Sequence, residues 1–401
     1  MNGPFSGLKV VELAEMVSGP YCGKLLADFD AEVIKVERPE GDPARRRGPF
    51  LGDDPDQEKS GLFLYLNTNK RGVTLDLADA TGRTRFLRLI ADADVLIEDR
   101  APGELSELGL GYDDLSAVNP GLVMVSITPF GQDGPYRDRA STHLTTYHSS
   151  GQGYMLPMMS ENLDREPVRG PGYLGEYDAG SAAAIAVLSA LFWRDGGGGS
   201  GQHIDISKQH AMAHLERSQL RRYLDSGVSP NRTGMGRLLE SLVRCKDGIY
   251  VILILSSEHQ WQGLFRAMGR PEWAREERFA TQASRSEHYP ELRERLAEWA
   301  ATLTSDEVFH LVQNEKSACA PAQTAETFHA SEQTRARQYF LPIAHPVTGV
   351  LEYPGWPYRF SGVEWRPTTG APLLGQHNDE VLDDSRRDVD YEDQPATASV
   401  R

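Results

Sequence analysis

The chain has 401 residues, a formal net charge of −16, and 39% hydrophobic and 25% charged residues. This composition is that of an ordinary globular protein long enough for two domains, and the acidic balance argues against nucleic acid as the main partner. Its three cysteines, Cys22, Cys245 and Cys319, lie far apart without CxxC spacing. They predict a cytoplasmic protein without disulfides or a zinc site. No apolar run reaches the length of a membrane span.

Strand-like and helix-like segments alternate in the first half of the chain. We predict strands at Leu8–Leu13, Glu32–Val36, Gly72–Leu77, Val95–Glu98, Leu122–Thr128 and His203–Ser207, and helices at Tyr21–Phe29, Ala80–Asp92, Ala179–Phe192 and Lys208–Asp225. This alternation predicts an α/β protein with a mostly parallel sheet layered by helices. No GxGxxG motif follows the first strand, so neither a nicotinamide nor a flavin cofactor is expected.

The second half is predicted to form a smaller α/β unit after a linker at Gly227–Arg237. Its elements are a strand at Gly248–Leu255 and helices at Gln260–Met268 and Leu292–Leu303. From Asp383 onward the sequence is polar and charged, which is typical of a disordered tail.

Two carboxylates, Glu176 and Asp178, stand beside the start of the predicted helix Ala179–Phe192, after a glycine-rich approach. Unpaired N–H groups at a helix start favour an ionised carboxylate, and a positioned carboxylate can act as a nucleophile. Asp178 is also a good N-capping residue for this helix. Spacing alone leaves both interpretations open and favours capping.

The densest positive run of the chain is Arg45-Arg46-Arg47. Arginine can form bidentate hydrogen bonds with phosphate, so contact with an anionic ligand is one interpretation of this run. A solvated loop is the other.

Short motifs follow one another along most of the chain. They include Gly7-Leu-Lys-Val-Val-Glu-Leu13, Ala31-Glu-Val-Ile-Lys-Val-Glu-Arg38, Leu66-Asn-Thr-Asn69-Lys70-Arg71, Gly131-Gln-Asp-Gly134-Pro135, Gly201-Gln202-His-Ile-Asp205-Ile-Ser207 and Ala371-Pro372-Leu-Leu-Gly375-Gln-His377. Each motif alone is weak, but the ordered set, over about residues 6 to 382, resembles the class III CoA-transferases of the CaiB/BaiF family.

This resemblance implies a large Rossmann-like domain, formed by residues 1–226 and completed by residues 326–382. A smaller α/β domain at 227–325 is inserted between them, and a tail follows from 383. The resemblance also implies an interlocked homodimer. Pairing with a paralogous subunit is the alternative, because some relatives work as pairs of unlike subunits.

The implied reaction moves CoA from an acyl-CoA thioester to a carboxylic acid through a mixed anhydride on an active-site carboxylate. Coenzyme A enters as part of the substrate, and no metal is required. Relatives carry the nucleophilic aspartate four residues before the glycine that matches Gly180, and this position holds Glu176. Three alternatives follow: Glu176 is the nucleophile, Asp178 replaces it, or the chain is a catalytically silent CoA-binding partner subunit.

The resemblance also assigns contacts to coenzyme A. Arg38 matches an arginine at the adenosine end of the ligand. Val17 and Ser18 stand where transferases often hold a polar residue that steadies the anhydride, and the Val17 side chain cannot donate a hydrogen bond. The other residues assigned to this site are Leu75, Asp99, Arg100 and Ala101, of which the acidic Asp99 is unfavourable beside a phosphate.

A racemase or isomerase is the second alternative function, because one branch of the family moves an α-proton with a histidine and an aspartate. His143 is one position out of register with that histidine, and no aspartate follows it.

Overall fold

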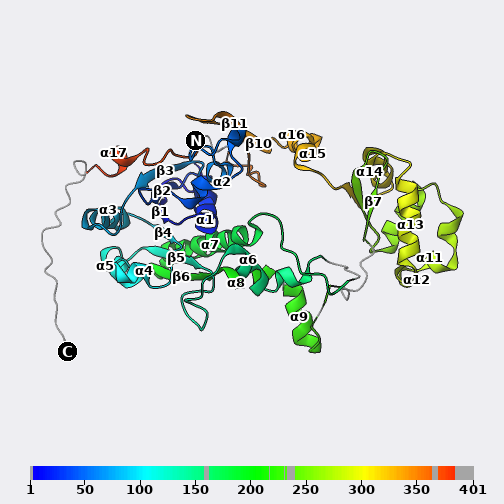
Figure 1. The fold of residues 1–401 in the computed structure, drawn as a ribbon, viewed down its shortest axis with the longest axis horizontal. Coiled ribbons are helices and arrows are strands. Elements are labelled where there is room, and N and C mark those ends of the chain that lie inside the picture. The colour runs from blue at the N-terminus through cyan, green and yellow to red at the C-terminus, as the bar shows by residue number, and fades with distance from the viewer. Residues whose placement is uncertain are drawn as a thin grey trace. The chain divides into compact units, whose positions relative to one another are not determined.

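Figure 1 shows the computed structural model, which describes residues 3–157, 162–215, 217–229, 231–232, 240–363 and 369–383. Contacts between Cα atoms divide the chain into two units. Unit 1 comprises residues 1–153, 169–217 and those from 341 onward, and unit 2 comprises residues 154–168 and 218–340. The predicted tail beyond 383 and most of the predicted linker lie outside the described residues. None of the helices described could cross a membrane.

Unit 1 is built on a six-stranded parallel sheet, which confirms the predicted α/β class. Its strands are β1 (Lys9–Leu13), β2 (Glu32–Glu37), β3 (Lys70–Thr74), β4 (Val95–Glu98), β5 (Val123–Thr128) and β6 (Gln202–Ser207). The strand order is β3-β2-β1-β4-β5-β6, so its direction reverses between β1 and β4. In open α/β sheets, ligands bind outside the carboxyl ends of the strands at such a reversal.

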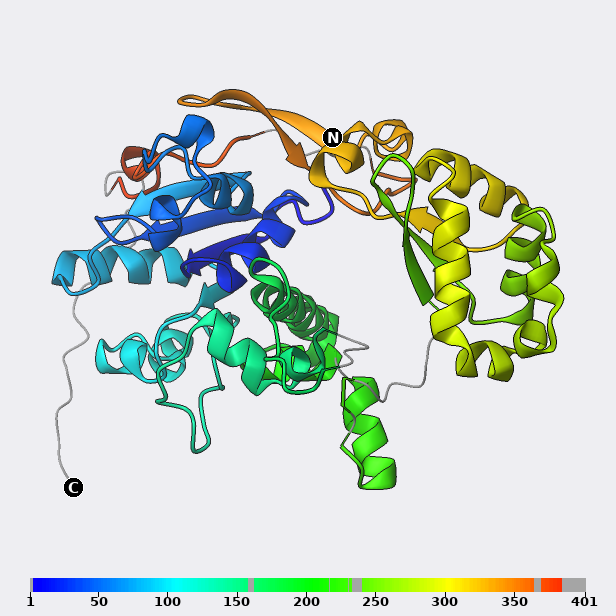
Figure 2. The ribbon, with the colours of Figure 1, turned by 45° about the vertical axis from the view of Figure 1, so that its right-hand side comes forward.

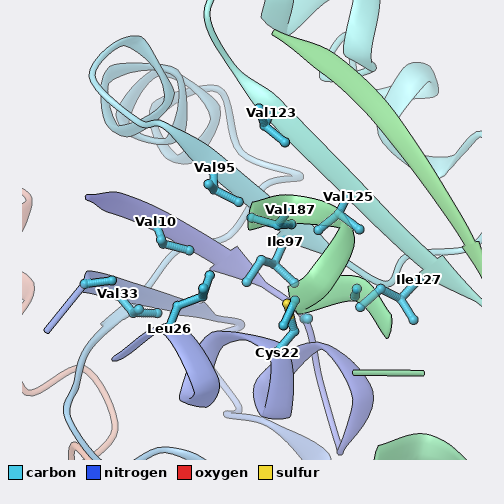
Figure 3. Close-up of a cluster of buried hydrophobic side chains, with 14 of the residues drawn as sticks. Val10, Cys22, Leu26, Val33, Val95, Ile97, Val123, Val125, Ile127 and Val187 are labelled. Carbon is cyan, nitrogen blue, oxygen red and sulfur yellow. The ribbon is translucent and has the colours of Figure 1, made fainter. Parts of the chain in front are cut away.

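Helices cover both faces of this sheet (Figures 1 and 2). The cluster on one face joins Val10 and other strand residues to α1 (Ser18–Ala27) and α7 (Leu174–Trp193) (Figure 3). On the other face, Val11 packs in the cluster of α3 (Ala80–Ala91) and α5 (Tyr112–Val118). The remaining described helices of unit 1 are α2 (Gly61–Leu66), α4 (Glu104–Glu107), α6 (His143–Ser149), α8 (Lys208–Leu215) and α17 (Asn378–Val381). Val10 and Val11 are neighbours on β1, and their side chains point to opposite faces of the sheet. The strand therefore packs apolar side chains against helices on both faces.

Two predicted helix starts in unit 1 are wrong. α1 begins at Ser18 rather than at Tyr21, because Pro20 is tolerated in the first turn of a helix. α7 begins at Leu174, so Asp178 lies inside the helix and does not cap it. The helix predicted after β6 is described as α8 and α9 (Arg217–Ser226), on either side of residue 216, which lies outside the described residues.

The last part of the chain returns to unit 1. The Gly72 amide donates to Nδ1 of His377 at 3.0 Å, and the Thr74 amide donates to Oδ1 of Asn378 at 2.8 Å. The closing motif therefore lies along the free edge of β3. A two-stranded sheet of β10 (Phe340–His345) and β11 (Gly349–Pro354) precedes it in the chain.

Unit 2 has its own antiparallel sheet and its own core. The strands are β7 (Glu240–Arg244), β8 (Tyr250–Ile254) and β9 (Cys319–Pro321). The longer helices are α10 (Glu258–Ala267), α13 (Tyr289–Ala300) and α14 (Ser305–Asn314), and the shorter ones are α11 (Glu277–Ala280), α12 (Gln282–Glu287), α15 (Ala325–Ala330) and α16 (Glu332–Ala336). The core forms around fully buried side chains such as Leu264, Leu292 and Leu296.

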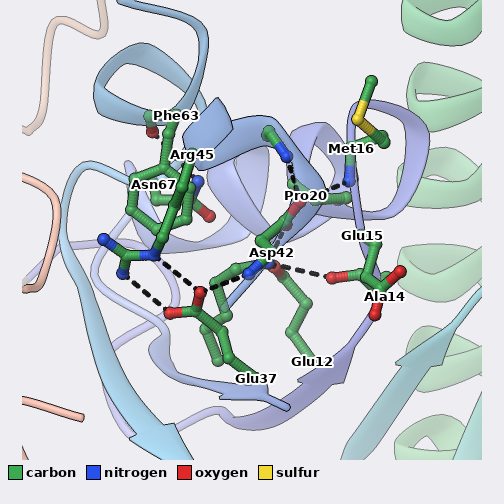
Figure 4. A network of polar contacts seen from close by, with 12 residues as sticks. Glu12, Ala14, Glu15, Met16, Pro20, Glu37, Asp42, Arg45, Phe63 and Asn67 are labelled. Atoms are coloured by element: carbon green, nitrogen blue, oxygen red, sulfur yellow. Dashed lines mark hydrogen bonds and ion pairs between the residues drawn. The ribbon is translucent and has the colours of Figure 1, made fainter. Parts of the chain in front are cut away.

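A buried network of charges supports the loop after β1 (Figure 4). Lys35 is fully buried, and its Nζ lies 3.1 Å from Glu12 and 2.9 Å from Asp42, and donates to the Ala14 carbonyl at 2.9 Å. Asp42 in turn accepts the Met16 amide at 3.0 Å. These contacts fix the backbone between β1 and α1, where Met16 has a positive φ of 62°.

Arg45 belongs to the same region and is not solvent-exposed. Its guanidinium contacts Glu37 at 2.8 Å and Glu58 at 2.7 Å (Figure 4 draws the Glu37 contact). Both sequence interpretations of the arginine run, a solvated loop and a phosphate contact, are therefore wrong for this residue. Glu37 and Glu58, 8 and 13 positions from Arg45 in the sequence, neutralise its charge.

Gly180 allows α7 to lie against the start of α1. A Cβ atom at this position would come within 2.6 Å of the Ser18 carbonyl oxygen, which is backbone and cannot rotate away. Gly180→Ala is therefore expected to push the helices apart and lower the free energy of unfolding by about 1–3 kcal/mol. Urea denaturation measures the change. Gly196→Ala is the control, because a Cβ atom added there would have no neighbour within 4 Å, and an equal loss in this variant would contradict the argument.

Candidate active site

A pocket of about 640 Å³ lies at the carboxyl ends of β1 and β4, where the strand order reverses. Six residues assigned from the sequence line it, namely Val17, Arg38, Asp99, Arg100, Ala101 and Glu176. Leu75 lines an adjoining pocket of about 390 Å³, which shares Arg38 and Arg100 with the first. The fold thus gathers residues that lie up to 159 positions apart, from Val17 to Glu176, at one edge of the sheet.

Glu176 lies in the first turn of α7 and is only 8% exposed. Its Oε2 accepts a hydrogen bond from the Ser18 hydroxyl and another from Nζ of Lys208 at 2.8 Å. Its Oε1 accepts no hydrogen bond from the described residues, and Nδ1 of His143 lies 4.0 Å from it. One carboxylate oxygen is therefore fixed and the other is available to a ligand.

The charge state of Glu176 follows from these contacts. Burial alone would raise its pKa, but the Lys208 ammonium and the hydrogen bonds from Lys208 and Ser18 outweigh burial. The pKa consequently lies below its usual value of 4.5. Glu176 is an ionised carboxylate at neutral pH.

Asp178 is placed differently. It lies two residues further along α7, about 200° around the helix axis, and is not among the residues that line the pocket. Burial raises its pKa. Of these two carboxylates, Glu176 is therefore the one that lines the pocket.

Ser18 and Lys208 supply the hydrogen-bond donors that Val17 cannot. The Val17 side chain is 1% exposed, whereas the neighbouring Ser18 begins α1 and points its hydroxyl at Glu176. Sequence reasoning missed Lys208. A signal was available, because Lys208 directly follows Ser207, the last residue of β6, and parallel strands present their carboxyl ends at the same edge.

The outer part of the pocket holds a mixed set of charges. Glu15 lies 3.2 Å from Nε of Arg38 and 3.0 Å from Nη1 of Arg100. Arg38 remains 55% exposed, so its guanidinium is accessible to an anionic ligand. Burial raises the pKa of Asp99 to about 7, although Lys208 and the Glu15 amide act in the opposite direction.

His143 also lines the pocket, and its side chain is 9% exposed. Burial lowers the pKa of this imidazole despite the nearby charge of Glu176, so it is neutral at physiological pH. Within the described residues, no group of three or more His, Cys, Asp or Glu side chains is arranged to hold a metal ion.

Comparison with known proteins identifies the family of the chain. Residues 5–378 match the profile of CoA-transferase family III. The chain is 34% identical over 395 residues to a succinyl-CoA–D-citramalate CoA-transferase of Chloroflexus aurantiacus, covering 95% of this chain and 94% of the relative. It is 31% identical to a succinate–glutarate CoA-transferase of Agrobacterium fabrum, covering 94% and 95% respectively.

A crystal structure of a CaiB/BaiF family protein from Brucella suis superposes with a TM-score of 0.83 at 33% identity, covering 94% of this chain and 98% of that one. The relatives also include alpha and beta subunits of a succinyl-CoA–L-malate CoA-transferase, at 32% and 31% identity. These findings confirm the resemblance seen in the sequence motifs, and the chain belongs to CoA-transferase family III.

Proposed function

We propose that this chain transfers CoA from an acyl-CoA thioester to a carboxylic acid, with Glu176 as the nucleophile. The observation that carries the proposal is an ionised carboxylate, fixed through Oε2 and open at Oε1, in a pocket lined by the predicted CoA residues. Because several relatives are named for succinyl-CoA, we propose succinyl-CoA as the donor. We assign contacts with the phosphates of CoA to Arg38, whose side chain is 55% exposed, and to Arg100, which also lines the pocket.

Glu176 differs from the aspartate of the family pattern, and its pocket supports a working nucleophile. The extra methylene moves the carboxylate by roughly 1.5 Å, and a displacement of this size can cost about 100-fold in rate when geometry is wrong. Here Lys208, at 2.8 Å, and Ser18 hold the displaced carboxylate in one orientation. These two hydrogen-bond donors therefore fix the orientation of the Glu176 carboxylate.

The assembly proposed for this function is a homodimer. Pairing with a paralogous subunit is the alternative, since relatives occur as alpha and beta subunits. In that alternative this chain binds CoA and a partner performs the transfer. An acyl-CoA racemase is the second candidate, favoured by one observation, the neutral His143 placed 4.0 Å from Glu176.

A trapping experiment tests the proposal. The full chain is mixed with succinyl-CoA, quenched in acid, and examined by intact mass and peptide mapping. A succinyl or CoA adduct on Glu176 is expected. If the chain forms no adduct, either alone or after addition of an aspartate-bearing paralogue, it is a silent subunit. Exchange of deuterium into the α-carbon without an adduct would identify a racemase.

The ionisation of Asp99 predicts a pH effect on substrate binding. Asp99 is neutral below its pKa of about 7 and anionic above it. A new negative charge beside the phosphates opposes binding, so KM for acyl-CoA is expected to rise about threefold from about pH 6 to about pH 8. Steady-state kinetics measure this rise. Asp99→Asn is expected to flatten the profile, and a variant that keeps the full rise would refute the assignment.

A further inference from the structure

The two oxygens of Glu176 have different surroundings, and this difference has consequences for each step of the proposed reaction. Oε2 accepts hydrogen bonds from Ser18 and, at 2.8 Å, from Lys208. Oε1 accepts none from the described residues. Oε1 is therefore the oxygen free to attack a thioester, and Oε2 is the oxygen that remains on the glutamyl group as its carbonyl.

The proposed reaction has four steps, each of which forms one bond and breaks another. Oε1 attacks the thioester carbonyl carbon, the C–S bond breaks, and CoA leaves as a thiolate. The thiolate attacks Cδ of Glu176, the Cδ–Oε1 bond breaks, and the donor acid leaves as a carboxylate. An acceptor carboxylate then attacks Cδ and expels the thiolate, which finally attacks the acceptor's acyl carbon and restores the Glu176 carboxylate. In every step one anion attacks and another leaves, each being a carboxylate or a thiolate. The reaction therefore needs no net proton transfer.

We infer that Lys208 is a catalytic residue that, together with Ser18, stabilises negative charge on Oε2 whenever Cδ is attacked. This inference rests on the proposed function. Attack on Cδ by thiolate or carboxylate converts the glutamyl carbonyl into a tetrahedral oxyanion, and its charge develops on Oε2. Donors already aimed at that atom in a mostly buried site need little reorganisation as the charge forms. The Lys208 side chain is 15% exposed, which keeps this ammonium largely screened from water.

The same contacts assign a lesser role to Lys208 in the first step. There the charge develops on the substrate's carbonyl oxygen, while Oε2 loses charge as the anhydride forms. An ammonium on Oε2 therefore does not favour the first step and strongly favours the two steps at Cδ. A residue that merely held Glu176 in place would affect all steps alike.

The test compares two rates in Lys208→Met. The full chain is mixed rapidly with succinyl-CoA alone. Anhydride formation is monitored through the CoA thiol that it releases, which reacts with a chromogenic disulfide. Formation of the glutamyl-CoA thioester is monitored by intact mass in the absence of that disulfide. Thioester formation is expected to fall about 100- to 1,000-fold, and thiol release less than about tenfold. Both rates are measured on aliquots of one protein preparation, so a change in the folded fraction cancels in their ratio.

Controls separate this inference from the proposed function. Lys208→Arg retains a charged donor and is expected to recover part of the thioester rate, and Ser18→Ala is expected to lower it about tenfold. Lys59→Met removes a lysine that pairs with Asp54 outside the pocket and is expected to change neither rate. An equal fall in both rates, or no fall, would overturn the role of Lys208 while Glu176 kept its adduct. Absence of any adduct on the unmodified chain would overturn the proposed function and this inference with it.

Discussion

Replacing Glu176 with glutamine is expected to abolish CoA transfer, with a loss of at least about 1,000-fold in kcat. The amide cannot form an anhydride by attack of an ionised oxygen, although it fills the same volume beside Lys208. Transfer from succinyl-CoA to a dicarboxylic acid measures the loss. Calorimetric titration with CoA is expected to show that binding persists, because Arg38 and Arg100 are untouched.

Asp178→Asn is the matched control for this change, since Asp178 lies on the same helix outside the pocket lining. Its activity is expected to remain within about threefold of the unmodified chain. Glu176→Asp is the informative intermediate. It withdraws the carboxylate from Lys208 by roughly 1.5 Å and is expected to lower the rate about 100-fold. Loss of transfer in Asp178→Asn, with Glu176→Gln still active, would reverse the assignment of the nucleophile.

Lys35→Met is expected to lower the free energy of unfolding at neutral pH by about 3–5 kcal/mol. Lys35 is fully buried between Glu12 and Asp42, and its removal leaves two buried carboxylates with one fewer cation. Lys70, at 2.7 Å from Glu12, compensates only one of them. Urea denaturation at neutral pH measures the loss, and Lys59→Met is expected to show no measurable change because its ion pair is near the surface.

The pH dependence of this loss has a defined sign. Burial raises the pKa of Asp42, but the Lys35 charge and the amides of Met16 and Ala44 outweigh it, so the pKa lies below its usual 3.8. The stability contributed by this depressed pKa is present above 3.8 and is lost as pH falls through the folded value. The difference in the free energy of unfolding between Lys35→Met and the unmodified chain should therefore be largest at neutral pH and smaller in acid. A difference of constant size would contradict the ion-pair explanation.

The buried network connects stability to the pocket. Asp42 accepts the Met16 amide and Lys35 donates to the Ala14 carbonyl, so both hold the backbone that leads into Ser18. Any variant of Lys35 that folds is thus also expected to place the Ser18 hydroxyl less accurately on Glu176.

Local sequence patterns were sufficient to predict the parallel sheet, and the family resemblance supplied six of the residues that line the pocket. Nearly continuous apolar runs such as Val123–Thr128 identify buried strands, because a strand covered on both faces carries apolar residues at neighbouring positions. The ordered motifs, one of which contains Arg38, pointed to the family, and the position four residues before Gly180 pointed to Glu176 as the candidate carboxylate. The motifs did not assign Lys208, whose contact with Glu176 spans 32 positions of sequence, although its place directly after β6 was a signal.

Chain order alone determined which residue types were available at the carboxyl ends of the strands, and hence the kind of chemistry. Tertiary structure alone decided how they work: it put Asp178 inside α7 instead of at its cap, buried Arg45 between two acidic residues, and brought Lys208 onto one oxygen of Glu176. The physical reason is that charge state and reach depend on burial and on partners distant in sequence. Neither quantity is encoded in local spacing.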